Sequence, residues 1–239
     1  MNPCFRILFL WLLCLCSLCA PAKTLNDKEL NRPYADLRAW HLGFSVGLHT
    51  QALSMTQSGA VGLDGSVWTI EQPSYQPGFC VNGLVSLRLN NYFSARIAPG
   101  LYFGNRNLQM LDATTGATER QSLKSTFIVA PVDLQYFARR HGNFRPYIVG
   151  GVMPAFDVTK RHGELIQLKR TDFYLSIGFG SDFYMRYFKF IPEVKFCFGL
   201  CDVLQTKRPD LEEDPYKLQF TSSLKRARSK MVVLTFYFE

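Results

Sequence analysis

Histidine and cysteine are the side chains that most often bind metal ions or serve as catalytic bases and nucleophiles. The 239-residue chain contains only 4 His. His41 and His49 occupy one alternating segment, and in an extended chain they would be about 26 Å apart, too far to share one metal ion. His141 and His162 are expected at opposite ends of the fold. The spacing of the histidines therefore predicts no metal site.

The cysteines offer no chemistry either. Four of the 7 belong to the extreme N-terminus, which leaves Cys80, Cys197 and Cys201. An odd number without a C-x-x-C motif gives neither a disulfide framework nor a zinc knuckle. Cys197 and Cys201 would be about 13 Å apart in a strand, beyond disulfide reach. Glycine loops for phosphate and paired carboxylates are absent, and no spacing singles out a serine for a Ser–His pair. We predict no catalytic residues, no cofactor and no enzymatic activity.

The N-terminus has the features of a targeting segment. Residues 7–20 form an apolar run, preceded by Arg6 and followed by Ala20-Pro21-Ala22. A charged start, a short apolar run and an A-x-A-like end are typical of a secretory signal peptide, and a spanning helix needs about 20 apolar residues. We assign 1–22 to a cleaved signal peptide, 23–39 to a polar periplasmic linker and 40–239 to the folded domain.

Large apolar residues alternate with small or polar ones through the rest of the chain. Residues 40–50, for example, read WHLGFSVGLHT. Strand side chains alternate between two faces, whereas a helix would scatter these residues around its axis. The pattern recurs, with an ambiguous phase only in FRPYIVGGVMPAF. We predict eight strands, within 40–50, 78–90, 92–104, 125–139, 144–156, 172–184, 188–200 and 231–239.

Prolines inside these segments predict local bulges, because proline cannot donate to a β-ladder. The residues concerned are Pro99, Pro131, Pro146, Pro154 and Pro192.

The minor face of the strands distinguishes a membrane barrel from a soluble one. It carries runs of Gly and Ser, such as Gly43, Ser45 and Gly47, rather than the Lys, Glu and Thr of a water-exposed face. Small residues fit the crowded interior of an eight-stranded barrel, so we expect the large apolar residues to face lipid. Single charges on the minor face must then pair across the interior. The candidates are Arg88, Arg96, Asp133, Asp182, Glu193 and Lys195.

The predicted connections alternate between long and short. The long ones span 51–76, 105–123, 157–171 and 201–227, and the short ones span 90–91, 139–143 and 185–187. Outer-membrane barrels have an even number of strands, short periplasmic turns and long outer loops. The sequence therefore predicts an all-β, eight-stranded antiparallel up-and-down transmembrane barrel of the outer-membrane type. Both termini would then lie in the periplasm.

The last strand ends on aromatic residues. Phe236 and Phe238 share one face of the terminal MVVLTFYFE. Outer-membrane barrels typically end on such a strand, which the barrel-insertion machinery reads. We therefore take these two residues as candidates for a C-terminal insertion signal.

Several phrases together resemble the PorT family of the type IX secretion system, which exports proteins across some Gram-negative outer membranes. They lie in order between His41 and Glu239, and the most specific are the run from Asp182 to Gly199 and the terminal LTFYFE. The phrases are HLGFSVGLHT, QPGFCVNGLVSLRLNNYFSARIAPGLYFGNRNL, FRPYIVGGV, LKRTDFYLSIGFGSDFYMRYFKFIPEVKFCFGL and SKMVVLTFYFE.

The resemblance implies an eight-stranded outer-membrane barrel required for the secretion of proteins with a C-terminal sorting domain, with other components of that machinery as partners. It implies no catalytic residues, and it leaves 51–76 and 201–227 unmatched. Two alternatives stay open. A generic small structural or adhesion barrel would share the physical pattern without the phrases. A soluble lipocalin-like ligand binder would need the opposite facing.

The chain is basic, with 27 Lys+Arg against 19 Asp+Glu and a net charge of +8. We expect no nucleic-acid partner for an exported protein. Clustered cations on an outer surface are either solvated rim charges or ligands for the phosphates of outer-membrane lipids. The two clusters are Lys160, Arg161, Lys169 and Arg170, and Lys225, Arg226, Arg228 and Lys230.

Overall fold

The computed structural model describes residues 31–60, 67–112, 116–159, 165–205, 220 and 223–239. The signal segment, the first part of the linker, Lys160, Arg161 and His162 lie outside the described residues. Within the described ranges, no helix is long and apolar enough to cross a membrane. After the short 3-10 helix η2 (Ala35–Leu37), the strands are β1 (Trp40–Gln57), β2 (Trp68–Tyr75), β3 (Pro77–Arg88), β4 (Phe93–Ile97), β5 (Gly100–Asp112), β6 (Thr118–Val129), β7 (Val132–Phe137), β8 (Phe144–Asp157), β9 (Thr171–Tyr184), β10 (Lys189–Gly199) and β11 (Leu224–Phe238).

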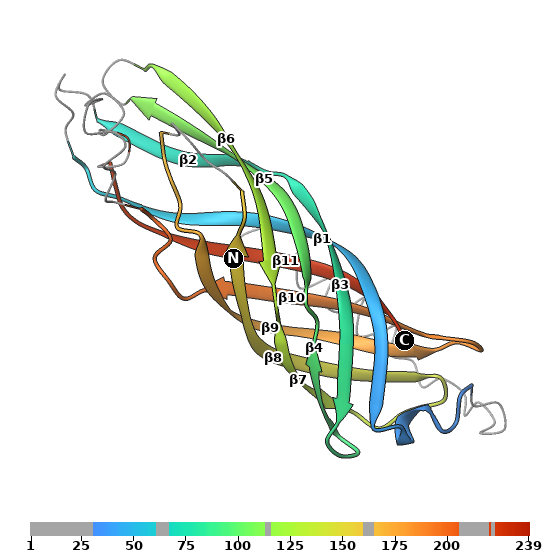
Figure 1. Cartoon of the computed structure of the whole chain (residues 1–239). Helices are drawn as coiled ribbons and strands as arrows, with labels where there is room; N and C mark the ends of the chain where they lie inside the picture. Colours follow the sequence, from blue (N-terminus) through green and yellow to red (C-terminus); the bar gives the residue numbers. More distant parts are fainter. Residues whose placement is uncertain (1–30, 61–66, 113–115, 160–164, 206–219, 221–222) are drawn as a thin grey trace, which may run out of the picture.

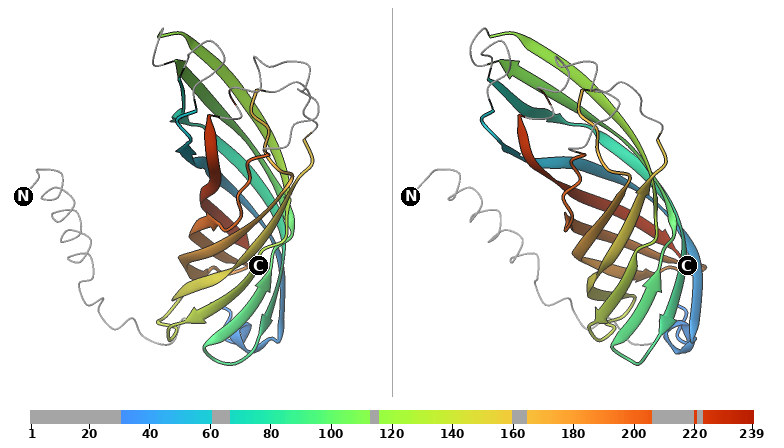
Figure 2. Two further views of the ribbon diagram at one scale, coloured as in Figure 1. Left: turned by 90° about the vertical axis from the view of Figure 1, so that its left-hand side faces the viewer. Right: turned by 60° about the vertical axis from the view of Figure 1, so that its left-hand side comes forward.

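The strands form one closed antiparallel sheet. β1 pairs with β3 on one side and with β11 on the other, so the first and last strands meet. β10 and β9 follow β11, and β9 pairs with β8, which reaches β3 through β7 and β4. Figures 1 and 2 show these strands wrapped around a common axis. The prediction of an all-β antiparallel barrel is confirmed.

The sheet contains eleven strands instead of the predicted eight, because two predicted strands are split and β2 is added beside β5. Two predicted strands are split: β4 and β5 are separated by Ala98 and Pro99, and β6 and β7 by Ala130 and Pro131. Proline lacks the N–H that a ladder needs, and this interrupts the pairing. The carbonyls of Pro99 and Pro131 still accept bonds from Gly83 (2.9 Å) and Ala98 (3.2 Å).

The other three prolines do not interrupt their strands. Pro146 and Pro154 lie within β8 in continuous register with β9, and Pro192 pairs with Phe236 of β11. The structure therefore has no bulge at these three positions, contrary to the prediction.

The additional strand β2 lies within the connection that was predicted over 51–76. Other strands are longer than predicted. β5 and β6 pair without a break from Gly100↔Val129 to Leu111↔Thr118, so the connection predicted over 105–123 reduces to 113–117. Most outward positions of β5 in this stretch are polar, such as Asn105 and Asn107. The apolar alternation stops there although the backbone pairing continues. Figure 2 shows β5 and β6, in green, projecting beyond the other strands.

The two ends of the barrel differ. The connections 89–92, 138–143 and 185–188 lie at the end that carries the C-terminus, which we call the short-turn end. At the other, projecting end, β2, β5, β6 and the ends of later loops enclose an apolar core of their own. It includes Trp68, Ile70, Leu108, Met110, Leu123, Ile166, Leu204 and Phe220.

The predicted facing is confirmed. Outward residues such as Leu42 and Ile177 are 71% and 61% exposed, whereas the inward Ser45 and Ser176 are 0% and 3% exposed. In water this arrangement would leave a large apolar belt uncovered, but in a bilayer the belt meets hydrocarbon. The structure therefore has the sidedness of a membrane barrel.

We expect arginine in the apolar belt to destabilise the barrel strongly. Leu175→Arg should lower the free energy of unfolding by about 2–4 kcal/mol, because the charge enters the middle of the hydrocarbon. Ser54→Arg, exposed on β1 beyond the belt, should cost no more than about 1 kcal/mol. Urea unfolding from phospholipid vesicles measures both values. Equal losses would show that the belt does not contact lipid.

Candidate functional site

Four charged residues meet in the middle of the barrel, and we call them the interior network: Arg96, Asp133, Glu193 and Lys195. Nη2 of Arg96 is 3.5 Å from Oδ2 of Asp133 and also binds Glu193. Nζ of Lys195 binds Asp133 and lies 3.3 Å from Oε1 of Glu193. The four come from β4, β7 and β10, so the network ties separate walls together. Two cations balance two carboxylates, as buried charges require.

Two tyrosines complete the network. The hydroxyl of Tyr147 donates to Glu193, and that of Tyr237 donates to the other carboxylate oxygen at 3.2 Å. The guanidinium carbon of Arg96 lies 4.2 Å from the centroid of the Tyr237 ring. β8 and β11 thus also contact the network, which fills the cross-section of the barrel at this level.

Glycines on the inward face make room for these side chains. A Cβ at Gly180 would lie 2.5 Å from the Tyr147 hydroxyl, and one at Gly151 would lie 2.6 Å from Oδ1 of Asp133. At either position the neighbouring side chain would have to shift to accept a Cβ atom. Small residues on the minor face therefore leave room for the large polar groups that cross the interior.

The other two predicted charges lie elsewhere. Asp182 pairs with Lys189, whose Nζ is 3.3 Å from Oδ2, and Lys189 also binds Glu239. Arg88 donates to the carbonyl of Asn90 at 3.4 Å and to the side chain of Asn91, in the turn after β3. The structure therefore brings four of the six candidates into one network and places Asp182 and Arg88 nearer the short-turn end.

The sequence interpretation missed the segment that closes the short-turn end. Residues 31–37, which we call the strap, cross the barrel mouth before β1 begins. The backbone N–H of Asn31 donates to Oδ1 of Asn143 (2.9 Å), and its side-chain amide donates to the carbonyl of Tyr184 (3.0 Å). Arg32 donates to the carbonyl of Glu239 at 3.0 Å. The strap is thus attached to the last residue of the chain.

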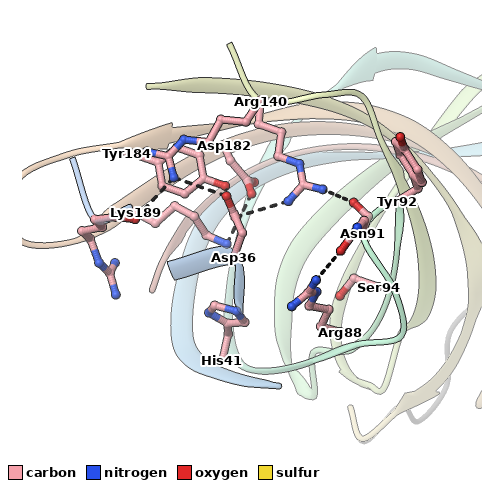
Figure 3. Close-up of polar contacts among 12 residues, drawn as sticks. Asp36, His41, Arg88, Asn91, Tyr92, Ser94, Arg140, Asp182, Tyr184 and Lys189 are labelled. Carbon is pink, nitrogen blue, oxygen red and sulfur yellow. Dashed lines mark hydrogen bonds and ion pairs between the residues drawn. The ribbon is translucent and has the colours of Figure 1, made fainter. Parts of the chain in front are cut away.

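Asp36 is the main anchor of the strap. Its carboxylate lies 3.3 Å from Arg140 and 3.2 Å from Arg145, and it accepts a hydrogen bond from the Tyr184 hydroxyl. Arg140 also stacks on Tyr184, with 3.6 Å between the guanidinium carbon and the ring centroid. Figure 3 shows Asp36 among Tyr184, Lys189 and Arg140.

The pKa of Asp36 reflects these contacts. Burial alone raises it, but the bond from Tyr184 and the guanidinium groups of Arg145 and Arg140 outweigh burial and lower the pKa below its usual value. The carboxylate is therefore charged, and held by two cations, at any physiological pH.

Beneath the strap lies a polar cavity of about 30 Å³, room for one or two water molecules. Its walls include Asp36, His41, Arg88, Asp182, Lys189 and Glu239. The residues that line this cavity include those that hold the strap and the C-terminal residue in place.

The two C-terminal aromatic candidates lie on the outward face of β11. The Phe238 ring stacks on Phe44 with centroids 5.3 Å apart, and the Phe236 ring stacks on Phe190 at 5.8 Å. These ring contacts link β11 to its two neighbours, β1 and β10. The role of Phe236 and Phe238 as an insertion signal stays a prediction.

The remaining candidate chemistry is dispersed. His41 is 3.7 Å from Glu239 at the short-turn end, whereas His49 stacks on Tyr102 with centroids 5.2 Å apart. Cys80 and Cys197 are buried free thiols and Cys201 is an exposed one. Among the described residues, no three His, Cys, Asp or Glu side chains are grouped in a way that could hold a metal ion.

A family model described as an outer membrane protein beta-barrel domain matches residues 26–205. The chain belongs to this family. It is therefore an integral outer-membrane protein, as the facing of its apolar belt requires. The match does not test the resemblance to the PorT family.

Two solved structures are similar to the chain. OprG from Pseudomonas aeruginosa has 12% sequence identity and a TM-score of 0.45, with 82% of this chain and 93% of that chain covered. AlkL, determined by solid-state NMR in DMPC bilayers, has 12% identity and a TM-score of 0.37, with 92% and 95% covered. No curated protein matches the sequence.

Removing one charge from the interior network should destabilise this barrel. Arg96→Met leaves two buried carboxylates with one cation, so we expect a loss of about 3–5 kcal/mol. Adding Glu193→Gln restores one cation for one carboxylate, and the double variant should lose less than the sum of the single variants. A double-mutant cycle in urea measures this coupling. Strictly additive losses would mean that the two groups do not interact.

Losing the Asp36 charge should release the strap. In Asp36→Asn, the amides of residues 35–37 should exchange hydrogen faster at pH 7, measured by mass spectrometry, while Asp202→Asn at the projecting end should leave them unchanged. The pKa of Asp36 is lower in the attached strap than in a free aspartate, where it is about 3.9. The attachment is therefore complete above about pH 3.9 and is lost only as the pH falls through the lowered pKa of Asp36. A nitroxide at Leu37 should therefore become mobile only in strong acid. Release of the strap between pH 5 and 7 would contradict this assignment.

Proposed function

We propose that this outer-membrane barrel is a non-enzymatic component required for protein export by a type IX secretion system, acting in the assembly or maintenance of the machinery. The support is the ordered series of PorT-like phrases between His41 and Glu239. Its partners would be other components of that machinery, the outer-membrane lipids and the barrel-insertion machinery, without nucleic acid.

The filled interior is the observation that carries a role through contacts rather than conduction. Arg96 on β4 reaches Glu193 on β10, and Tyr147 on β8 meets the same carboxylate. Side chains from separate walls therefore touch across the barrel. Apolar clusters lie on either side of this level, one containing Ile191 and the other Cys197. A cargo protein has no path through such an interior, so any contribution to export comes from the surfaces.

The short-turn end is the surface best built for periplasmic contacts. We infer that both termini lie in the periplasm, since outer-membrane barrels place their short turns there. The strap is held by Asp36 and by the Arg32 contact to Glu239. A strap fixed in this way would offer a partner a rigid surface at the mouth of the barrel.

A second candidate is a structural or adhesion barrel. The projecting end favours it, because Trp68 of β2, Met110 of β5 and Leu123 of β6 pack into an apolar core outside the belt. Such a core makes the projection rigid enough to bear contacts at the cell surface. The soluble lipocalin-like alternative is contradicted, because the apolar residues face outward and the family is one of outer-membrane barrels.

Deleting the gene should trap cargo proteins with C-terminal sorting domains in the periplasm. We expect this because the barrel contacts the export machinery without conducting cargo itself. The measurement is the cargo content of culture medium and periplasm by immunoblotting, with detergent sensitivity as the control for membrane integrity. Complementation with Glu193→Leu/Arg96→Met, which keeps charge balance, should restore export.

Removal of Phe236–Glu239 should reproduce the deletion, because the loss of β11 pairing at the short-turn end exposes strand edges in lipid at several kcal/mol per group. Normal export in the deletion strain would exclude the secretion role and favour the structural or adhesion barrel.

A further inference from the structure

The outward face of β11 changes character along its length. From the C-terminus it presents Phe238, Phe236, Leu234 and Val232, and then only cations. Lys230, Arg228 and Arg226 follow at every second position, all exposed. Alternate residues of a strand are about 6.6 Å apart on one face. The cations therefore form a row that continues the apolar belt toward the projecting end.

The neighbouring strand changes at the same level. On β1, Leu48 pairs with Leu234, and Thr50 pairs with Val232. Beyond them the outward partners are small: Ala52 lies opposite Lys230 and Ser54 opposite Arg228. The apolar belt thus ends at one level on both strands, and the short β1 side chains leave the cations uncovered.

A register shift adds a fourth cation. Arg226 pairs with Thr56, but the next residue of β1, Gln57, pairs with Leu224, so Lys225 has no opposite residue. A bulge of this kind lets consecutive side chains reach one side. Lys225 is exposed beside Arg226. We call Lys225, Arg226, Arg228 and Lys230 the basic rim.

The basic rim is not part of the charge pairing described above. None of its four side chains forms an ion pair or hydrogen bond with another described residue. On its other side, Phe198 of β10 lies opposite Lys230 and is 47% exposed. Cations and lipid-facing aromatics are therefore adjacent on the same outward surface.

We propose that the basic rim binds the phosphate groups of membrane lipids in the leaflet at the projecting end. Lipid phosphates lie where the hydrocarbon ends, which is the level at which Val232 gives way to Lys230. Arginine matches phosphate oxygens in a bidentate manner, and cations at an anionic membrane surface attract lipid headgroups. The rim points outward from the belt and not into a pocket, so the ligand is a lipid rather than free phosphate. This site is independent of the export role.

Lipid competition in nanodiscs tests the proposal. The full-length barrel is placed in phosphatidylcholine discs with spin-labelled phosphatidic acid or spin-labelled phosphatidylcholine, and the motionally restricted fraction of each is measured. We expect the wild type to prefer phosphatidic acid and Arg228→Gln/Lys230→Gln to lose that preference by about tenfold or more, since each cation near the surface is worth about fivefold. Arg228→Lys should retain most of it.

The matched control is Arg120→Gln/Lys124→Gln, which removes two exposed cations from the projecting part of β6. It should stay within about twofold of the wild type. Heat-modifiable gel mobility establishes that each variant is folded. An unchanged preference in the rim variant, an equal loss in the control, or displacement of the labelled lipid by equimolar inorganic phosphate would each overturn the proposal.

Discussion

The pairing of the first strand with the last is the contact on which the rest of the structure depends. Hydrocarbon offers no partner to a backbone N–H or C=O, so every strand in the belt needs a neighbour on both sides. β1 and β11 provide the final ladder, from Phe44↔Phe238 to Gln57↔Leu224. Because this ladder begins at the penultimate residue of the chain, the C-terminal aromatics are both lipid-facing side chains and part of the closure.

Closing the sheet fixes the space inside the barrel, and this space determines which residues can point inward. Side chains from opposite walls meet, so a large polar group on one strand is accommodated by a glycine or serine on another, as Tyr147 is by Gly180. The charges of Arg96, Asp133, Glu193 and Lys195 balance one another. The same closed interior excludes conduction of a protein, and this leaves the two ends and the outer rim as the surfaces that can act.

Most of the fold could be predicted from the alternation of apolar and polar residues within each strand. Ser45 and Ser176 could be placed inside and Leu42 and Ile177 outside from period-two patterning, because each strand reports its own facing. β2 escaped prediction because Pro73 and polar residues in WTIEQPSY hide its alternation. β5 and β6 are longer than predicted because their parts outside the belt need no apolar outward face. The alternation used to predict strands is therefore missing there.

Contacts between residues far apart in the sequence limited how much of the candidate site could be predicted. The interior network was predictable, since single charges on a small-residue face must pair. The strap was not, because Asp36 meets Arg140 and Tyr184, which lie 104 and 148 residues further along the chain. Nothing in the polar linker reports such partners. Arg88 alternates with inward residues, but its position next to the turn lets it bond to Asn91 instead of reaching the network.

We propose that the barrel serves export through contacts at its short-turn end. In-cell photocrosslinking tests it most directly, with a benzophenone amino acid at Tyr187, which is 83% exposed in the turn between β9 and β10, and at Tyr75, which is 64% exposed near the projecting end. Adducts would be identified by mass spectrometry. We expect Tyr187 to crosslink to a component of the secretion machinery and Tyr75 not to do so. Crosslinks to that machinery from Tyr75 alone would contradict it.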